Sequence, residues 1–230
     1  MVKVLSVGGS IVVPEFPDTE FLKKFSTLVR TWLAKDDDRK LILVVGGGGP
    51  ARIYQNAYKQ IIENPADNGT ADWIGIMATR LNAQLLKSIF SDLCLQDVVY
   101  DPTSVSEIKG KILVAAGWKP GFSTDTDAIF LAEQFGAKTV VNLSNIEQVY
   151  TDDPKKNPDA KPLDKISWKD FRKMVGDEWV PGKNCPFDPI ASKKAESANI
   201  DVICAGGKDI ANIEKILNEQ EFFGTKISNN

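Results

Sequence analysis

Histidine is absent from the 230 residues of this chain. The absence excludes a Ser-His-Asp triad, a Cys-His nucleophile pair and any metal site with histidine ligands. Chemistry must therefore rely on carboxylates, amines, hydroxyls, thiols or backbone N–H groups. Phosphoryl transfer remains possible, because it depends on positioning and positive charge more than on covalent help from the protein.

Cysteine and long apolar runs are also scarce. The three cysteines, Cys94, Cys185 and Cys204, are widely spaced, which argues against a disulfide framework or a zinc site and favours a reducing, cytoplasmic location. No apolar run approaches the roughly 18 residues that a membrane helix needs. The apolar stretch within residues 1–13 is interrupted by Gly8-Gly9 and has no signal-cleavage pattern after it, so we interpret it as a strand and a turn.

Excess positive charge is missing as well. The chain carries 28 Lys and Arg against 31 Asp and Glu, a net charge of −3. We therefore expect neither a nucleic acid nor an anionic membrane as partner. The length and the 43% hydrophobic content indicate a globular protein with one large domain or two unequal lobes.

Short apolar runs alternate with longer amphipathic segments. The predicted strands are residues 2–7, 41–45, 112–115, 139–143 and 201–204. The predicted helices are residues 19–33, a helix from Pro50, and residues 73–90, 124–135, 188–198 and 209–217. Continuous Val, Ile and Leu in the strands indicates burial on both faces, so we expect an α/β fold: a three-layer αβα sandwich with a mostly parallel central sheet. A polar stretch at residues 144–160 predicts a soft boundary between two lobes that share this sheet.

Glycine is concentrated where three predicted strands meet helices, at Gly8-Gly9-Ser10, at residues 46–49 and at residues 117–124. Parallel strands place all such junctions at one edge of the sheet. Glycine there can simply make tight turns, but it also lets backbone N–H groups approach an anion closely. Four glycines in succession, followed by Arg52, favour phosphate binding. The pattern is neither a Walker A loop nor a dinucleotide fingerprint.

Seven segments, in this order, give the chain its resemblance to the amino acid kinase family, and within it to the archaeal-type uridylate (UMP) kinases. They are Gly8-Gly9-Ser10; residues 44–48 with Ala51-Arg52; residues 72–76 and 78–83; residues 120–125; residues 144–145 through 149–151 with Asp153-Pro154; residues 188–191; and Gly224-Thr225. The resemblance implies transfer of the ATP γ-phosphoryl group to UMP in the presence of Mg²⁺, giving ADP and UDP. It also implies a homo-oligomer, usually a hexamer, with an acceptor lobe at residues 1–143 and an ATP lobe at residues 144–230.

The resemblance also assigns site residues, with Arg52 and Ser10 as the catalytic pair and no metal-ligating side chain. The implied ATP-binding residues are Gly8, Gly9, Ser10, Gly48, Arg52, Ser144, Asn145, Tyr150 and Asp153. The implied UMP-binding residues are Gly47, Asp72, Trp118, Lys119, Pro120, Gly121, Phe122, Ser123 and Thr124. Asp72 matches a carboxylate that accepts hydrogen bonds from the ribose hydroxyls.

Several of these residues have plainer interpretations. Without the resemblance, Asp72 is a helix N-cap, Arg52 a surface arginine and Tyr150 a packing residue. Asp125 and Asp127 suit a first helical turn, where carboxylates stabilise the helix dipole.

The chain also departs from the family at three places. Ser6 stands where many relatives carry a lysine, which leaves Lys3, Lys119 and Lys183 as candidates for the phosphate charge. Glu147-Gln148 replaces a usual Asp-Gly and could alter a turn beside the adenine pocket. Residues 181–187 are atypical and could change substrate choice.

Two other functions stay open. A kinase of the same fold could phosphorylate an amino acid or carbamate, although Asp72 has no evident use in such a site. A nucleotide-dependent binding or storage protein would bind ATP without acceptor-dependent ADP release.

Overall fold

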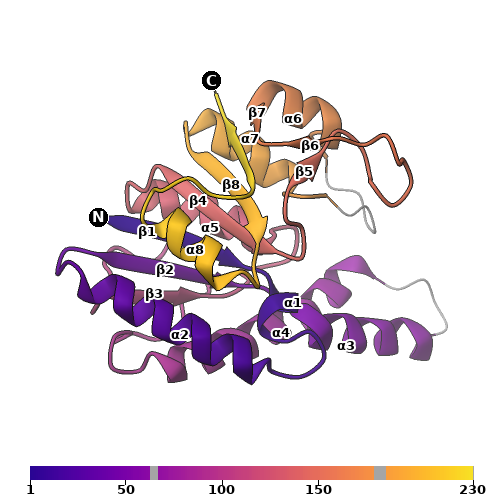
Figure 1. Cartoon of the computed structure of the whole chain (residues 1–230). Coiled ribbons are helices and arrows are strands. Elements are labelled where there is room, and N and C mark those ends of the chain that lie inside the picture. Colours follow the sequence, from indigo (N-terminus) through magenta and orange to yellow (C-terminus); the bar gives the residue numbers. More distant parts are fainter. Residues whose placement is uncertain (63–66, 179–184, 230) are drawn as a thin grey trace.

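The computed structural model describes residues 1–62, 67–178 and 185–229 (Figure 1). The strands are β1 Val2–Val7, β2 Lys40–Val45, β3 Ile112–Ala115, β4 Thr139–Ser144, β5 Val149–Tyr150, β6 Pro162–Leu163, β7 Lys165–Ser167, β8 Asp201–Gly206 and β9 Thr225–Ser228. The helices are α1 Gly9–Val12, α2 Thr19–Ala34, α3 Gly48–Ile61, α4 Asn68–Ile89, α5 Thr124–Gln134, α6 Trp168–Val175, α7 Pro189–Ser197 and α8 Ile210–Leu217.

One mixed sheet forms the middle layer, and in the described residues its order is β3-β2-β1-β4-β8-β9-β7. The first five strands in that order are parallel to one another. β9 runs antiparallel to β8, and β7 runs parallel to β9. The mostly parallel α/β architecture is therefore confirmed. The antiparallel β9, the short strands β5, β6 and β7, and helices α1 and α6 were not expected from the apolar runs.

Helices cover both faces of the sheet (Figure 1). Alternating side chains of one strand enter different cores, so that Leu5 and Val7 pack with α2, α4 and α8, whereas Val4 packs with α5, α6 and α7. Two tryptophans tie neighbouring elements together: the Trp32 indole N–H of α2 donates to the Leu217 carbonyl of α8 at 3.1 Å, and the Trp168 indole N–H of α6 donates to the Ile200 carbonyl just before β8 at 3.1 Å. Burial on both faces explains why the strand sequences are apolar throughout.

Aspartate side chains begin several helices. Asp18 caps α2 by accepting from the Phe21 N–H at 3.0 Å. α4 begins at Asn68, earlier than predicted, because Asp67 accepts from the Thr70 N–H at 2.8 Å. The interpretation of Asp72 as an N-cap is therefore wrong, and this carboxylate is available for another role.

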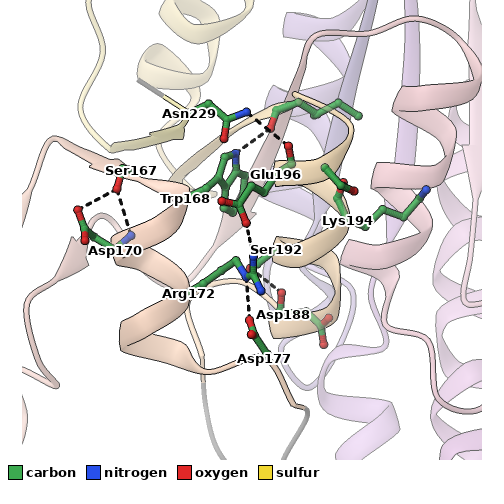
Figure 2. Close-up of polar contacts among 12 residues, drawn as sticks. Ser167, Trp168, Asp170, Arg172, Asp177, Asp188, Ser192, Lys194, Glu196 and Asn229 are labelled. Carbon is green, nitrogen blue, oxygen red and sulfur yellow. Dashed lines mark hydrogen bonds and ion pairs between the residues drawn. The ribbon is translucent and has the colours of Figure 1, made fainter.

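α6 and α7 pack together beside the β7 edge of the sheet (Figure 2). Arg172 of α6 donates to Asp177 at 2.7 Å and also pairs with Glu196 of α7. Asp188 caps α7 through the Ala191 N–H at 2.7 Å. The ion pair therefore ties α6 to the C-terminal half of α7, while Asp188 caps the other end of that helix. No helix in the described part of the chain is long and apolar enough to cross a membrane.

Candidate active site

The carboxyl ends of the five parallel strands bring the glycine junctions to one edge of the sheet, as expected. β1 leads into Gly8, β2 into Gly46 and β3 into Ala116-Gly117. β4 ends at Ser144 and β8 at Gly206, whose successor Gly207 donates its N–H to the Ser144 carbonyl at 2.8 Å. The β8 junction, Gly206-Gly207-Lys208, is a part of this edge that sequence reasoning missed.

The first two glycine loops touch backbone to backbone. A Cβ on Gly9 would lie 2.1 Å from the Gly48 nitrogen and 2.5 Å from the Gly46 carbonyl carbon. Gly48 has a φ of +65°, and a Cβ there would lie 2.4 Å from the Gly9 carbonyl oxygen. These glycines are therefore required by close packing as well as by turning. Because α3 begins at Gly48, its first N–H groups have no partner inside the helix. The Gly49 N–H donates instead to the Val13 carbonyl at 2.9 Å, which leaves the N–H groups of Gly47 and Gly48 as the candidates for an anion.

Arg52 and Ser10, the predicted catalytic pair, come together across the two loops. An Arg52 guanidinium nitrogen donates to the Ser10 hydroxyl oxygen at 3.0 Å. Arg52 has no ion pair with a carboxylate among the described residues. Its positive charge is thus left uncompensated beside the glycine loops, where it can attract a phosphate.

The loop between β3 and α5 meets Asp72, as the resemblance implies. The Gly121 N–H donates to the Asp72 carboxylate at 3.4 Å, and Gly121 has a φ of +85°. The Trp118 and Phe122 rings lie 4.8 Å apart, and the Lys119 ammonium lies 3.9 Å from the Trp118 ring centre. This loop therefore carries an ammonium and two aromatic rings of its own and lies against the acidic side chain of Asp72.

Two buried polar residues of α4 hold the loops in place. Thr79 accepts from the Gly117 N–H at 2.8 Å. Asn82 donates to the carbonyl oxygens of Gly46 and Gly47 at 2.9 and 3.1 Å. Sequence reasoning did not assign these roles, although polar residues on the inward face of a helix are a usable signal.

Ser6, at the position where a lysine is common, donates its hydroxyl to Asp125 at 2.9 Å. Desolvation, and then the nearby Asp188 carboxylate, raise the pKa of Asp125 to about 6. Asp127 is wholly buried, and burial raises its pKa to about 7. The interpretation of these two aspartates as only helix-dipole residues is therefore incomplete.

The residues that the resemblance assigns to the ATP ribose and adenine follow β4 and β5. Ser144 accepts from the Ile146 N–H at 3.1 Å, and Asn145 is exposed beside it. Tyr150 is half-buried in the β5–β6 ladder, and Asp153 begins the exposed loop that joins those strands. The structure brings Ser144 and Asn145 to the glycine edge, whereas no hydrogen bond joins Tyr150 or Asp153 to the glycine loops among the described residues.

Glu147 and Gln148, which replace the family's Asp-Gly, adopt ordinary backbone conformations. Neither Glu147 nor Gln148 has a positive φ. Gln148 is buried and donates to Asp164 at 2.9 Å and to the Gly224 carbonyl at 3.2 Å. Its side chain therefore ties the start of β5 to the approach of β9.

The lysine candidates differ in position. Lys3 lies at the opposite end of β1 and pairs with Glu219, so it is remote from the glycine loops. Lys119 belongs to the acceptor loop, and Lys183 lies outside the described residues, as do residues 181–184 of the atypical segment. Lys208, a candidate that sequence reasoning missed, follows the β8 junction and pairs with Asp18.

Comparison with known proteins agrees with this architecture. The chain belongs to the amino acid kinase family, whose model matches residues 1–206. It is 36% identical to the uridylate kinase of Methanocorpusculum labreanum over 229 residues, 98% of this chain and 95% of that protein. It is 36% identical to the uridylate kinase of Pyrococcus abyssi over 211 residues, 90% of each chain. The crystal structure of uridylate kinase from Archaeoglobus fulgidus aligns with a TM-score of 0.82 and 31% identity, covering 99% of this chain and 100% of that one.

Proposed function

We propose that this chain is a nucleoside monophosphate kinase that transfers the γ-phosphoryl group of ATP to UMP, giving ADP and UDP. The observation that carries the proposal is the meeting of the glycine loops, Arg52 and the Asp72-bound loop at one sheet edge. The archaeal relatives named uridylate kinase supply the acceptor.

In the reaction, an oxygen of the UMP phosphate forms a bond to the γ-phosphorus as the bond to the β,γ-bridging oxygen breaks. That acceptor oxygen is already deprotonated near neutral pH, because the second phosphate pKa is about 6. No general base is required, which is consistent with a chain that lacks histidine. The protein's contribution is then alignment and charge stabilisation.

We assign the glycine loops and Arg52 to the migrating phosphoryl group. Backbone N–H groups at the start of α3, near Gly47 and Gly48, suit phosphate oxygens. Arg52 supplies positive charge to the transition state, and Ser10 holds the guanidinium in place.

We assign UMP to the β3 side of this sheet edge and ATP to the β4 side. On the acceptor side, Asp72 accepts from the ribose hydroxyls of UMP, and the loop at residues 117–124 encloses the nucleotide. On the donor side, Ser144, Asn145, Tyr150 and Asp153 form the ATP ribose and adenine pocket. The acceptor lobe is residues 1–143 and the ATP lobe residues 144–230.

Mg²⁺ is proposed as a companion of the ATP phosphates. The described residues contain no group of three or more Cys, Asp or Glu side chains that could hold a metal. Mg²⁺ characteristically keeps several waters and is held through substrate phosphates. We therefore assign the ion to the ATP phosphates and water, and no step above depends on a protein ligand to it.

We propose that the protein is a cytoplasmic homo-oligomer, a hexamer by its family resemblance, that serves pyrimidine nucleotide synthesis. The packed pair α3 and α4 exposes Trp73, Met77 and Leu81, one helical turn apart from each other, beside Ile53 and Tyr54. An apolar stripe of this kind suits a second copy of the chain. Light scattering should give a multiple of 25.3 kDa, and Leu81→Glu should reduce that mass.

The deciding experiment measures ADP release from ATP and Mg²⁺ with UMP, CMP, dUMP, AMP, aspartate, carbamate or acetylglutamate as acceptor. We expect release with UMP to exceed release with every other acceptor. Preference for a carboxylate or carbamate acceptor would keep the fold and replace the substrate. ATP binding without release for any acceptor would favour a nucleotide-dependent binding or storage protein.

A further inference from the structure

Asp127 is an acid in a place where an apolar side chain would be expected. It lies in the first turn of α5 and is 0% exposed, between Thr126 and Ala128, which are also buried. One carboxyl oxygen, Oδ1, has no hydrogen-bond partner among the described residues. A buried carboxyl group that is only half satisfied destabilises a fold, so its presence calls for another reason.

No positive charge compensates Asp127 within the described chain. The charged groups that act on it are Asp125 on its own helix and Asp101 on the loop before β3, and both are acids. Other polar groups around α5 have different partners. The Ser6 hydroxyl of β1 and the backbone N–H of Asp188 both donate to Asp125, and Lys194 of α7 pairs with Glu133. Cys204 of β8 is a buried thiol under the influence of Asp125. An ion pair therefore does not explain the residue.

Among the described residues, the one hydrogen bond of the Asp127 carboxyl group leads directly to the acceptor loop. Its Oδ2 accepts from the backbone N–H of Trp118 at 3.2 Å. The Trp118 carbonyl oxygen in turn accepts from Arg80 at 3.1 Å, and the Gly117 N–H donates to Thr79 at 2.8 Å. Both peptide groups at the start of the loop are thus held by side chains from α4 and α5.

We infer that Asp127 is a positioning residue for the acceptor: its carboxyl group anchors the Trp118 N–H and so places the loop at residues 117–123 against Asp72. The inference rests on the proposed function, since it concerns the affinity of that same site for UMP. Asp127 is wholly buried, so we do not place it against a substrate. It acts through the loop, whose far end reaches Asp72 through the Gly121 N–H.

The ionisation of Asp127 gives this role a signature. A carboxylate accepts an N–H more strongly than a neutral acid does, so the anchor strengthens as pH rises through the pKa of about 7. The Michaelis constant for UMP should fall between pH 6 and pH 8. UMP itself ionises near pH 6, so the comparison is made with a variant that cannot titrate.

The test compares three variants. Asp127→Leu keeps the branching of the side chain and removes the acceptor oxygen. Asp127→Asn keeps an acceptor oxygen and removes the titration. Leu131→Ala, at another wholly buried position of α5, is the control for general loosening of the helix. Each is assayed for the Michaelis constants of UMP and ATP, for turnover, and for thermal unfolding.

We expect Asp127→Leu to raise the Michaelis constant for UMP about tenfold, which corresponds to about 1.4 kcal/mol, and to leave that for ATP within twofold. Asp127→Asn should keep a low Michaelis constant for UMP with a weaker dependence on pH. Equal Michaelis constants for UMP in the wild type and Asp127→Leu would overturn the inference. A rise of the Michaelis constants for UMP and for ATP by the same factor, as in the control Leu131→Ala, would also overturn it.

Amide hydrogen exchange at Trp118 separates this inference from the proposed function, because it needs no activity. Exchange should be at least tenfold faster in Asp127→Leu than in the wild type or Leu131→Ala. Unchanged exchange would overturn the anchoring role of Asp127. A wild type that releases no ADP with UMP would overturn the proposed function instead.

Discussion

Replacing Gly9 with alanine tests whether the direct contact between the first two glycine loops is needed for catalysis. The added Cβ would lie 2.1 Å from the Gly48 nitrogen and 2.5 Å from the Gly46 carbonyl carbon, whereas ordinary contacts begin near 3.4 Å. Both neighbours are backbone atoms, so no flexible side chain can move aside. The two loops must separate by more than 1 Å.

The size of the expected effect follows from that displacement. A shift of about 1 Å in groups that align a reaction can cost about 100-fold in rate. Overpacking of this kind destabilises a protein by about 1–3 kcal/mol. For a chain of this length, each kcal/mol lowers the unfolding temperature by about 2–4 °C. We therefore expect at least a 100-fold loss of kcat/KM and a moderate loss of thermal stability in Gly9→Ala.

The assay is UMP-dependent ADP release, with thermal unfolding followed by circular dichroism. Gly69→Ala is the matched control, because it adds the same methyl group in the exposed first turn of α4, where the nearest atom would be 3.4 Å away. That control should keep wild-type kinetics and stability. Retention of kcat/KM within threefold in Gly9→Ala would refute the argument that the loops must touch.

Four further changes test other parts of the molecule. Arg52→Ala should lower kcat at least tenfold in steady-state kinetics, because it removes positive charge beside the phosphoryl group that is transferred. An unchanged kcat would show that Arg52 has only a structural role. Asp72→Asn should raise the dissociation constant of UMP more than that of ATP in calorimetry, and equal weakening would contradict the ribose assignment. Gln148→Ala should cost about 1–3 kcal/mol in urea unfolding, because it leaves the buried Gly224 carbonyl oxygen without the amide donor, and no loss would show that water replaces the amide. The raised pKa values of Asp125, about 6, and Asp127, about 7, mean that the folded protein binds more protons than the unfolded chain between about pH 4 and pH 7. The free energy of unfolding should therefore fall as pH rises through this window. A smaller fall in Asp127→Asn than in the wild type would confirm that the Asp127 carboxyl group contributes to it.

The parallel core was predictable because its strands are buried on both faces. Residues 2–7 and 112–115 form strands with the predicted bounds, since unbroken Val, Ile and Leu leave few alternatives. β9 was not predictable in this way. Its four residues, Thr225–Ser228, alternate in burial and owe their strand conformation to pairing with β8 and β7. The helix predicted from residue 73 begins at Asn68 instead, because the Asp67 side chain caps α4 there.

The candidate site was predictable to the level of its loops. Parallel topology alone brings Gly8-Gly9 and residues 46–49 to one edge, and the close contact of Gly9 with Gly48 agrees with that expectation. The contact between Ser6 and Asp125 joins residues 119 positions apart, a pairing that local patterns do not encode. The positions of Thr79 and Asn82 depend likewise on how α4 docks against the sheet.

The place of β9 in the sheet has a consequence for the order of assembly. β7 ends at Ser167, yet its only partner in the described sheet is β9, which begins at Thr225. During synthesis from the N-terminus, β7 must wait for more than 50 further residues before it can pair, whereas β1 and β2 can pair much earlier. A ribosome-bound chain should therefore protect β1 and β2 from proteases well before it protects the segment around β7. The last strand to emerge completes the edge of a sheet whose centre has already formed.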